Sequence, residues 1–162
     1  MKKDTFKLLA LGLIISFVSI CAPAFAADPE DEAGVNEAKV IEIKGTADYL
    51  SLGQTQWKPL EIGTLLYEGD KMRTLKDSSV IVETKGSAKT ATMTVRKETE
   101  FTFKNFRHDD ATKIDNTLLE LEVGSVMVEA EKLVGASRFE VKTPTSVVGI
   151  RGTKFEVNVA KE

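Results

Sequence analysis

Apolar and polar residues alternate along most of the chain beyond Ala38. In the stretch ATMTVR, Ala91, Met93 and Val95 have one parity, while two threonines and an arginine have the other. Because successive side chains of a β-strand point to opposite faces, this pattern predicts a strand that is buried on one side. The strands predicted in this way are Val40–Leu50, Leu65–Tyr67, Lys71–Leu75, Val80–Thr84, Ala91–Arg96, Glu100–Phe106, Leu118–Ala130, Arg138–Lys142 and Lys154–Val159.

Turn-forming residues separate these strands and set their spacing. Within the longest stretch, Leu119 and Leu121 face inward, and Gly124 interrupts the alternation. About nine short strands at intervals of ~8–12 residues are typical of an all-β domain. The pattern predicts one compact all-β domain over residues 38–162 and leaves a sandwich, a barrel and a β-solenoid open. The predicted turns are Gly53–Gln54, Glu68–Asp70, Lys76–Ser78, Lys85–Ser87 and His108–Asp110.

The N-terminal residues 1–26 have the three-part pattern of a secretory signal peptide. Three lysines precede the uncharged apolar run Leu8–Ile20, and Ala24 and Ala26 occupy the small-residue positions of a cleavage site. The run is shorter than the ~20 residues that a membrane-spanning helix requires. We expect cleavage after Ala26, a periplasmic or secreted location, and no stable membrane span afterwards.

Cys21 is the only cysteine of the chain. It could be a lipid attachment site, but Ile20 is larger than the residue that usually precedes such a cysteine. After cleavage the chain would have no thiol, and hence no disulfide, thiol nucleophile or cysteine-ligated metal. Residues 27–37, ADPEDEAGVNE, contain five acids and no base, which predicts a disordered, solvated lead-in rather than an acidic recognition tail.

The charge of the chain argues against two classes of partner. The whole chain has a formal net charge of −3, and the signal peptide contributes three lysines against Asp4, so the exported chain is near −3 − 2 = −5. A mildly acidic domain without a basic cluster is a poor candidate for binding nucleic acid or an anionic membrane.

Few residues suggest catalytic or ligand chemistry. His108, the single histidine, lies beside Asp109 and Asp110 in a polar turn, where solvated side chains are more common than a metal or catalytic site. Trp57 and Tyr67 could contact a partner or a sugar, although a large ring more often covers the end of a sheet. Phosphate-loop, zinc and zincin motifs are missing from the sequence. We therefore expect no enzyme activity, no cofactor and no metal.

The stretch TPTSVVGIRGTKFEVNV places Arg151 between Gly149 and Gly152 in an apolar run. Pro144 fixes a bend, after which Ser146–Ile150 is expected to enter the core. The glycines would supply positive φ or allow another backbone to approach closely. Arg151 would then hold a chain corner by binding carbonyl groups or an acid such as Asp70, with Thr153 capping the turn. The alternative is an exposed arginine that anchors a partner.

The chain resembles the FecR domain family of bacterial exported proteins. The resemblance runs from about Val40 to Val159, and its most specific segments are GDKMRT, residues 69–74, and VKTPTSVVGIRGTKF, residues 141–155. The positions that match the family's pattern are Gly69, Asp70, Thr74, Pro144, Gly149, Arg151, Gly152, Thr153 and Phe155.

The resemblance implies a non-catalytic, all-β domain outside the inner membrane. The best-known members regulate sigma factors and combine this domain with a cytoplasmic anti-sigma region, a spanning helix and a further domain that meets an outer-membrane transporter. Only seven residues precede the apolar run and few follow Val159, so we expect a single exported FecR-like domain.

Three functional hypotheses follow from these expectations. The preferred one is a periplasmic interaction or assembly module that docks on another exported or envelope protein through a sheet edge or its loops. The alternative is a module that binds a ligand such as cell-wall glycan through Trp57, Tyr67 and nearby acids. A role in sigma-factor or iron-transport signalling is the weakest, because it requires a membrane-bound partner.

Overall fold

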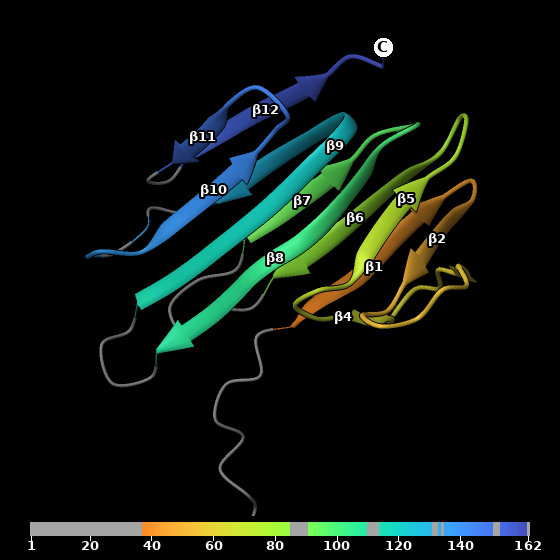
Figure 1. Ribbon diagram of the computed structural model, residues 1–162, viewed down its shortest axis with the longest axis horizontal. Helices are drawn as coiled ribbons and strands as arrows, with labels where there is room; N and C mark the ends of the chain where they lie inside the picture. The colour runs from red at the N-terminus through yellow and green to blue at the C-terminus, as the bar shows by residue number, and fades with distance from the viewer. Residues whose placement is uncertain are drawn as a thin grey trace, which may run out of the picture. The chain divides into compact units, whose positions relative to one another are not determined.

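The computed structural model describes residues 37–84, 91–109, 114–130, 133, 135–150 and 153–161. In these ranges the chain forms twelve β-strands and no helix, so the predicted all-β class is confirmed (Figure 1). The predicted signal peptide and nearly all of the lead-in lie outside the described residues. The strands are β1 (Ala38–Lys44), β2 (Ala47–Leu50), β3 (Lys58–Pro59), β4 (Leu65–Leu66), β5 (Lys71–Thr74), β6 (Ser79–Thr84), β7 (Ala91–Val95), β8 (Glu100–Asp109), β9 (Ile114–Ala130), β10 (Arg138–Lys142), β11 (Val147–Ile150) and β12 (Thr153–Val159).

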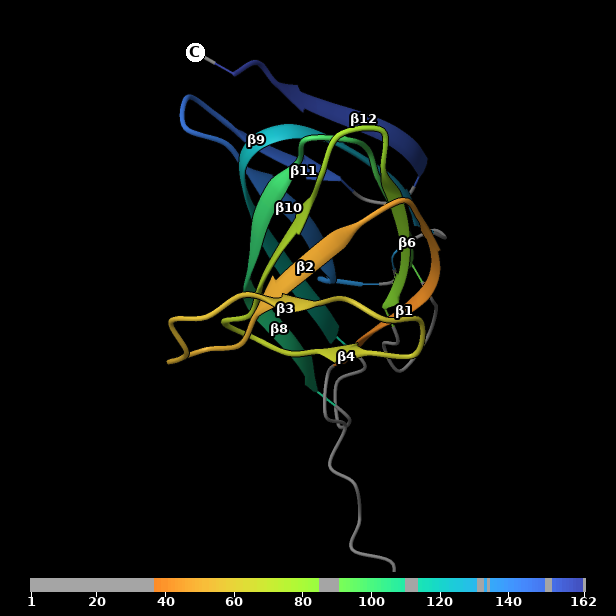
Figure 2. The same cartoon turned by 90° about the vertical axis from the view of Figure 1, so that its right-hand side faces the viewer.

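These strands build two sheets that share the long strand β9. The first sheet has the order β4-β1-β6-β7-β9-β12, and the second has the order β3-β2-β5-β8-β9-β10-β11. Neighbouring strands are antiparallel except β9 and β10, which run parallel. Figure 2 shows the strands curling around a common interior, so the arrangement is a mostly antiparallel half-barrel.

Among the places where the described chain crosses between the two sheets, four neighbouring corners each contain a residue with positive φ. Within β9 this residue is Gly124, with φ 95°, and a Cβ atom there would lie 2.7 Å from the carbonyl oxygen of Glu98. No side chain fits at that distance, so the corner of β9 requires glycine. The equivalent residues are Gly45 between β1 and β2, Asp77 between β5 and β6, and Glu98 between β7 and β8.

Buried hydroxyl groups connect neighbouring corners. The Ser78 hydroxyl accepts a hydrogen bond from the Thr46 amide at 2.8 Å, and the Thr74 hydroxyl accepts one from the Thr99 amide at 3.1 Å. The Thr99 hydroxyl in turn accepts from the Ser125 amide at 2.9 Å. Since a buried amide without a partner is costly, these hydroxyls stabilise backbone that the sheet ladders do not reach. Thr74 is one of the motif residues singled out in the sequence.

The core lies between the inner faces of the two sheets. Phe101, Phe103 and Phe106 of β8 point into it and form edge-to-face pairs with ring centroids 5.1 Å and 5.7 Å apart. Leu119 and Leu121 are fully buried, as the alternation in β9 predicts. Burial of each such side chain contributes roughly 1.5–3 kcal/mol, so this core is the main source of stability.

Three parts of the predicted strand pattern differ from the structure. The turn predicted at His108–Asp110 is wrong for its first two residues, because His108 and Asp109 belong to β8. The sequence predicts one strand over Val40–Leu50, whereas the chain turns a corner at Gly45 and forms β1 and β2. The pattern also misses β3 and β11. Lys58–Pro59 is too short to alternate, and the VVGI segment of β11 has apolar residues at both parities.

Candidate interaction site

The first motif segment, GDKMRT, consists of the last two residues of the β4–β5 connection and of β5 itself. The Asp70 carboxylate is buried and accepts hydrogen bonds from the Leu52 amide at 2.9 Å and the Tyr67 amide at 3.0 Å. The backbone also binds β8, because the Gly69 amide donates to the Phe103 carbonyl at 2.7 Å. A carboxylate that accepts two amides shapes a loop, so these motif residues hold the β4–β5 connection in place.

The second motif segment begins with the turn between β10 and β11. The Thr143 amide donates to the Ser146 carbonyl at 2.7 Å, and the Ser146 amide donates to the Thr143 hydroxyl at 3.0 Å. Pro144 lies exposed in the bend between them. These bonds close a tight hairpin and direct β11 back along β10.

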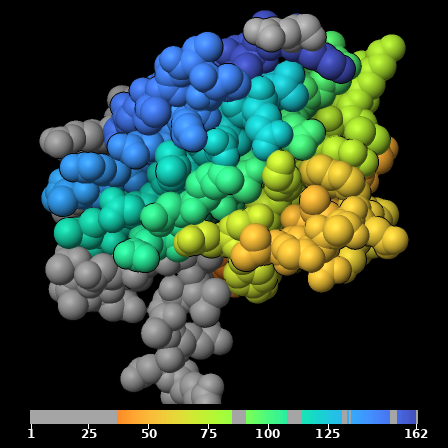
Figure 3. Space-filling view, in the orientation of Figure 1, coloured from red at the N-terminus to blue at the C-terminus, as the bar shows by residue number. Residues whose placement is uncertain are grey.

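The strand that follows the turn is the outer edge of the second sheet. Among the strands that the structure describes, β11 pairs with β10 alone, and Figure 3 shows the blue segment that carries both strands along one rim of the visible face. Val147 is 61% exposed, while Val148 and Ile150 are half-buried against the core. The expectation that Ser146–Ile150 enters the core is therefore met in part by Val148 and Ile150 and is wrong for the other three residues, because an edge strand buries one face only.

Gly149 has neither of the roles predicted for it within the chain. Its φ is not in the positive range. Among the described residues, a Cβ atom there would meet nothing closer than the side chain of Glu140, at 3.7 Å, which is an ordinary van der Waals contact. The close backbone approach that a glycine permits is therefore not used by the chain itself.

The remaining motif residues lie at or beyond the limit of the description. Arg151 and Gly152 lie outside the described residues, so the corner clamp and the exposed anchor both stay predictions. Thr153 begins β12. Phe155 is half-buried and packs edge-to-face on Phe139, with centroids 6.5 Å apart.

A groove of about 740 Å³ separates the β10–β11 turn from the end of β12. Val148, Val157 and Val159 give it an apolar lining, and Glu156 lies at its side. Glu156 binds the Ser125 hydroxyl at 2.7 Å and forms an ion pair with Arg96, and these contacts lower the pKa of its carboxyl group. The carboxylate is therefore engaged within the chain.

A comparison with known proteins shows the family to which these motif segments belong. The family model described as FecR protein matches residues 70–162, more than half of the chain. The chain belongs to the FecR protein family. The match begins at Asp70 and includes β5 to β12, whereas the resemblance in the sequence extends back to about Val40. Neither a curated protein nor a solved structure matches the chain.

FecR proteins are envelope-associated, non-enzymatic proteins of signalling. Among the described residues, no helix is long and apolar enough to cross a membrane. The same residues contain no group of three or more histidine, cysteine or acidic side chains placed to hold a metal ion. His108 and Asp109 end β8, but their side chains and Asp110 are outside what the structure describes, so their chemistry stays a prediction.

Trp57, a candidate ligand contact, is engaged with neighbouring charges in this FecR domain. The Arg73 guanidinium lies 4.2 Å from the centre of the indole ring and donates two hydrogen bonds to Asp48, at 2.9 Å and 2.8 Å. One face of the ring is therefore covered by a cation. Tyr67 is 42% exposed, and no ring contact joins it to Trp57, although both rings are described.

The outer face of the second sheet carries paired charges. Glu120 lies between Lys142 and Lys104, at 3.0 Å from each, and the two ammonium groups lower the pKa of its carboxyl group. Lys71 binds Glu122 at 2.9 Å, which raises the pKa of the lysine. The charges of this face are matched to one another, which leaves little net field to attract a charged ligand.

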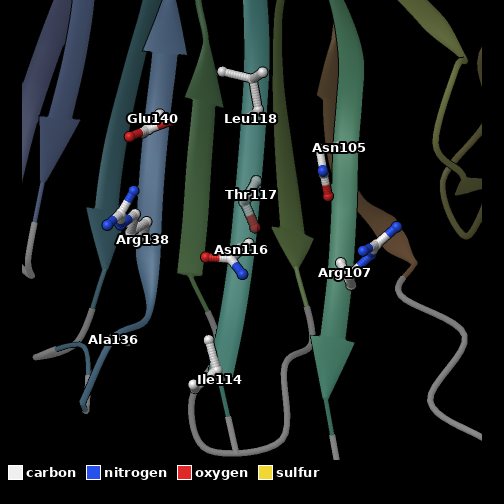
Figure 4. A pocket seen from close by; sticks show the side chains of 9 residues that line it. All are labelled: Asn105, Arg107, Ile114, Asn116, Thr117, Leu118, Ala136, Arg138 and Glu140. Atoms are coloured by element: carbon white, nitrogen blue, oxygen red, sulfur yellow. The ribbon is translucent and has the colours of Figure 1, made fainter.

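A shallow hollow of about 450 Å³ lies on the same face, near the β8–β9 hairpin. In one cross-strand row, Asn116 is flanked by Arg107 and Arg138. Figure 4 shows that the two arginine side chains lean away from β9 in opposite directions, so they do not converge on one point. The hollow therefore lacks a built anion site. Its full lining is Asn105, Arg107, Ile114, Asn116, Thr117, Leu118, Ala136, Arg138 and Glu140.

Sequence reasoning missed the hydroxyl groups that hold the corners of the FecR domain. In each corner a serine or threonine directly follows the residue with positive φ. Three of these four hydroxyl residues are buried. The sequence contains this feature as four two-residue segments, each with serine or threonine in second place. A search for exact repeats overlooks them because the first residue varies. The four pairs are Gly45-Thr46, Asp77-Ser78, Glu98-Thr99 and Gly124-Ser125.

Proposed function

We propose that this FecR domain is a non-catalytic periplasmic module that acts in assembly or as an accessory to signalling, by docking on another folded protein of the envelope. The observation that carries the proposal is the free edge of β11, where Val147 is 61% exposed. Family membership supports a signalling context, and the signal-peptide pattern of the sequence supports export.

The edge of β11 differs from the other strands that end the two sheets. β3 and β4 have two residues each, and β3 contains Pro59, which cannot donate to a ladder. β12 carries Lys154 and Glu156 on its exposed face. Short strands, proline and charges are the devices by which proteins prevent edge-to-edge pairing. β11, with the sequence VVGI, contains neither proline nor a charge and is twice as long as β3 or β4, so it is the edge left open to another strand.

An edge strand of this kind recognises partners through its backbone. Its free amide and carbonyl groups would bind an added strand, and the exposed Val147 side chain would pack on that strand. The charges nearby are already paired, since Lys142 binds Glu120 and Glu156 binds Arg96. Binding should therefore depend mainly on strand pairing and apolar contact, and only weakly on salt.

Site-specific photo-crosslinking tests the proposal. A photoreactive residue would replace Val147 in the protein expressed in its own cells, and crosslinked products would be identified by mass spectrometry. We expect one discrete product, formed with a specific envelope protein or with a second copy. The matched control is the same residue at Ile62, which is 65% exposed in the loop between β3 and β4. If position 147 gives no product, or the same products as position 62, the docking function is wrong.

A further inference from the structure

The ladder between β10 and β11 determines which backbone groups of β11 are free. The bond from the Thr143 amide to the Ser146 carbonyl marks the first hydrogen-bonded pair of the hairpin. Hydrogen-bonded and non-hydrogen-bonded pairs alternate in an antiparallel ladder, so the next bonded pair is Val141 with Val148. The amide and carbonyl groups of Val147 and Gly149 consequently point away from β10, toward the open edge.

We propose that this edge pairs with the same edge of a second copy of the chain. The pairing is antiparallel, and a two-fold axis passes beside Val148. In this register Val147 of each copy exchanges two hydrogen bonds with Gly149 of the other, so all the outward backbone groups of both residues are bonded. The inference rests on the proposed docking function and names the occupant of the same edge.

The side chains of β11 are self-complementary in this register. Val147 is 61% exposed, and it would lie opposite Gly149 of the second copy, which has no side chain. The space at Gly149 is open, because a Cβ atom there would meet only the Glu140 side chain at 3.7 Å. The valine of each copy therefore fits over the glycine of the other. This contact gives Gly149 the close-approach role that it lacks within one chain.

The charges beside β11 are also compatible with the two-fold pairing. Glu140 is the register partner of Gly149, and Lys142 is the register partner of Val147. Each cross-strand row of the paired sheet would then contain Glu140 of one copy and Lys142 of the other, with no like charges opposed. Such an isologous contact closes at two copies, because the same patch serves on both sides.

The match between valine and glycine is what favours a second copy over an unrelated strand. A foreign strand would have to supply a small residue at one position and an apolar one two residues away, whereas a second copy has both. The contact is small, in the class below about 1,200 Å² that is typical of transient complexes. We therefore expect a dissociation constant on the order of 0.1 mM.

Sedimentation velocity of the protein tests the pairing, at concentrations from about 10 µM to about 1 mM. We expect the wild type to shift from monomer to dimer as the concentration rises. For both Val147→Lys and Gly149→Val, the dissociation constant of the dimer should be at least tenfold higher. Melting temperatures should be unchanged or slightly raised, since both positions are exposed and a valine is favoured in strands. If the variants dimerise as the wild type does, the dimer uses another surface and the inference is wrong.

Disulfide trapping tests the register with a covalent readout. In a Cys21→Ser background, Val148→Cys places two thiols at a non-hydrogen-bonded pair, where Cα atoms lie ~4.5 Å apart and a disulfide can form. We expect rapid dimer formation on mild oxidation, and little with Val147→Cys, which faces glycine, or with Asn158→Cys on β12. Dimer formation with Val147→Cys instead would overturn this register.

The two proposals fail in distinguishable ways. A chain that is monomeric at every concentration and gives no disulfide dimer at position 148 refutes the second copy. If the photoreactive residue at position 147 still crosslinks to another envelope protein, the docking function stands with a different occupant. If neither a second copy nor another protein crosslinks there, both proposals are wrong.

Discussion

Replacement of Asp70 by alanine should destabilise the domain without changing its surface. The carboxylate is 5% exposed and binds the amides of Leu52 and Tyr67 at 2.9 Å and 3.0 Å. Hydrogen bonds to a charged group contribute roughly 1.5–3 kcal/mol each. Because both amides are only partly buried, water would replace part of the two lost hydrogen bonds. We therefore expect a net loss of about 2–4 kcal/mol in the free energy of unfolding.

Equilibrium denaturation by urea, followed by circular dichroism, measures this loss. The midpoint should fall while the slope with denaturant is unchanged, because the unfolded surface is the same. Glu61→Gln is the matched control, since Glu61 is exposed and its hydrogen bonds to Thr64 are made by its backbone, and it should change stability by less than about 0.5 kcal/mol. If Asp70→Ala also changes stability by less than about 0.5 kcal/mol, the structural role assigned to this motif residue is refuted.

Three further predictions concern glycines, surface carboxylates and the motif arginine. Gly124→Ala should lower the free energy of unfolding by more than about 3 kcal/mol in urea denaturation, because the residue has φ 95° and no room for a Cβ atom. Gly149→Ala is the control and should change the free energy of unfolding by less than about 0.5 kcal/mol. Equal effects of the two substitutions would contradict the corner geometry. Since ion pairs lower the pKa of Glu120, its stabilisation is present above the unfolded-state pKa and lost as pH falls through the folded-state value. The melting-temperature difference between wild type and Glu120→Gln should therefore shrink from about pH 7 to about pH 3, and a difference that grows would refute the assignment. Arg151→Ala should lower the melting temperature sharply if the arginine clamps a corner, and should weaken partner crosslinking at unchanged melting temperature if it is an exposed anchor.

Much of the fold follows from local pattern. Alternation identifies the buried positions of β5, β6, β7 and β10, since a strand with one wet face must place apolar residues at every second position. It does not do so in β8, where a bulge between Phe103 and Asn105 shifts the parity and Phe106 is buried. Pairing order does not follow from alternation. β9 lies beside β7, β8, β10 and β12, and this arrangement depends on a single residue, Gly124, that lets one strand belong to two sheets.

The candidate site was predictable only in part, because its properties depend on what lies beside each residue. The motif around Asp70 and the bend at Pro144 are visible in the sequence, but one of the two partners of the Asp70 carboxylate, the Leu52 amide, comes from a loop 18 residues away. Apolar content suggested that Ser146–Ile150 is core. An apolar segment is equally compatible with an exposed edge, and only the neighbouring strands decide between the two.

The sequence by itself determined the all-β class, the position of most strands and the family. These properties are local, since they depend on residues that are adjacent or two apart. The tertiary structure alone decided that β11 is a free edge, that Val147 is exposed, and that the missing side chain of Gly149 is not used within the chain. Edge and interior are properties of the whole sheet, because they are set by which distant strands bind on either side.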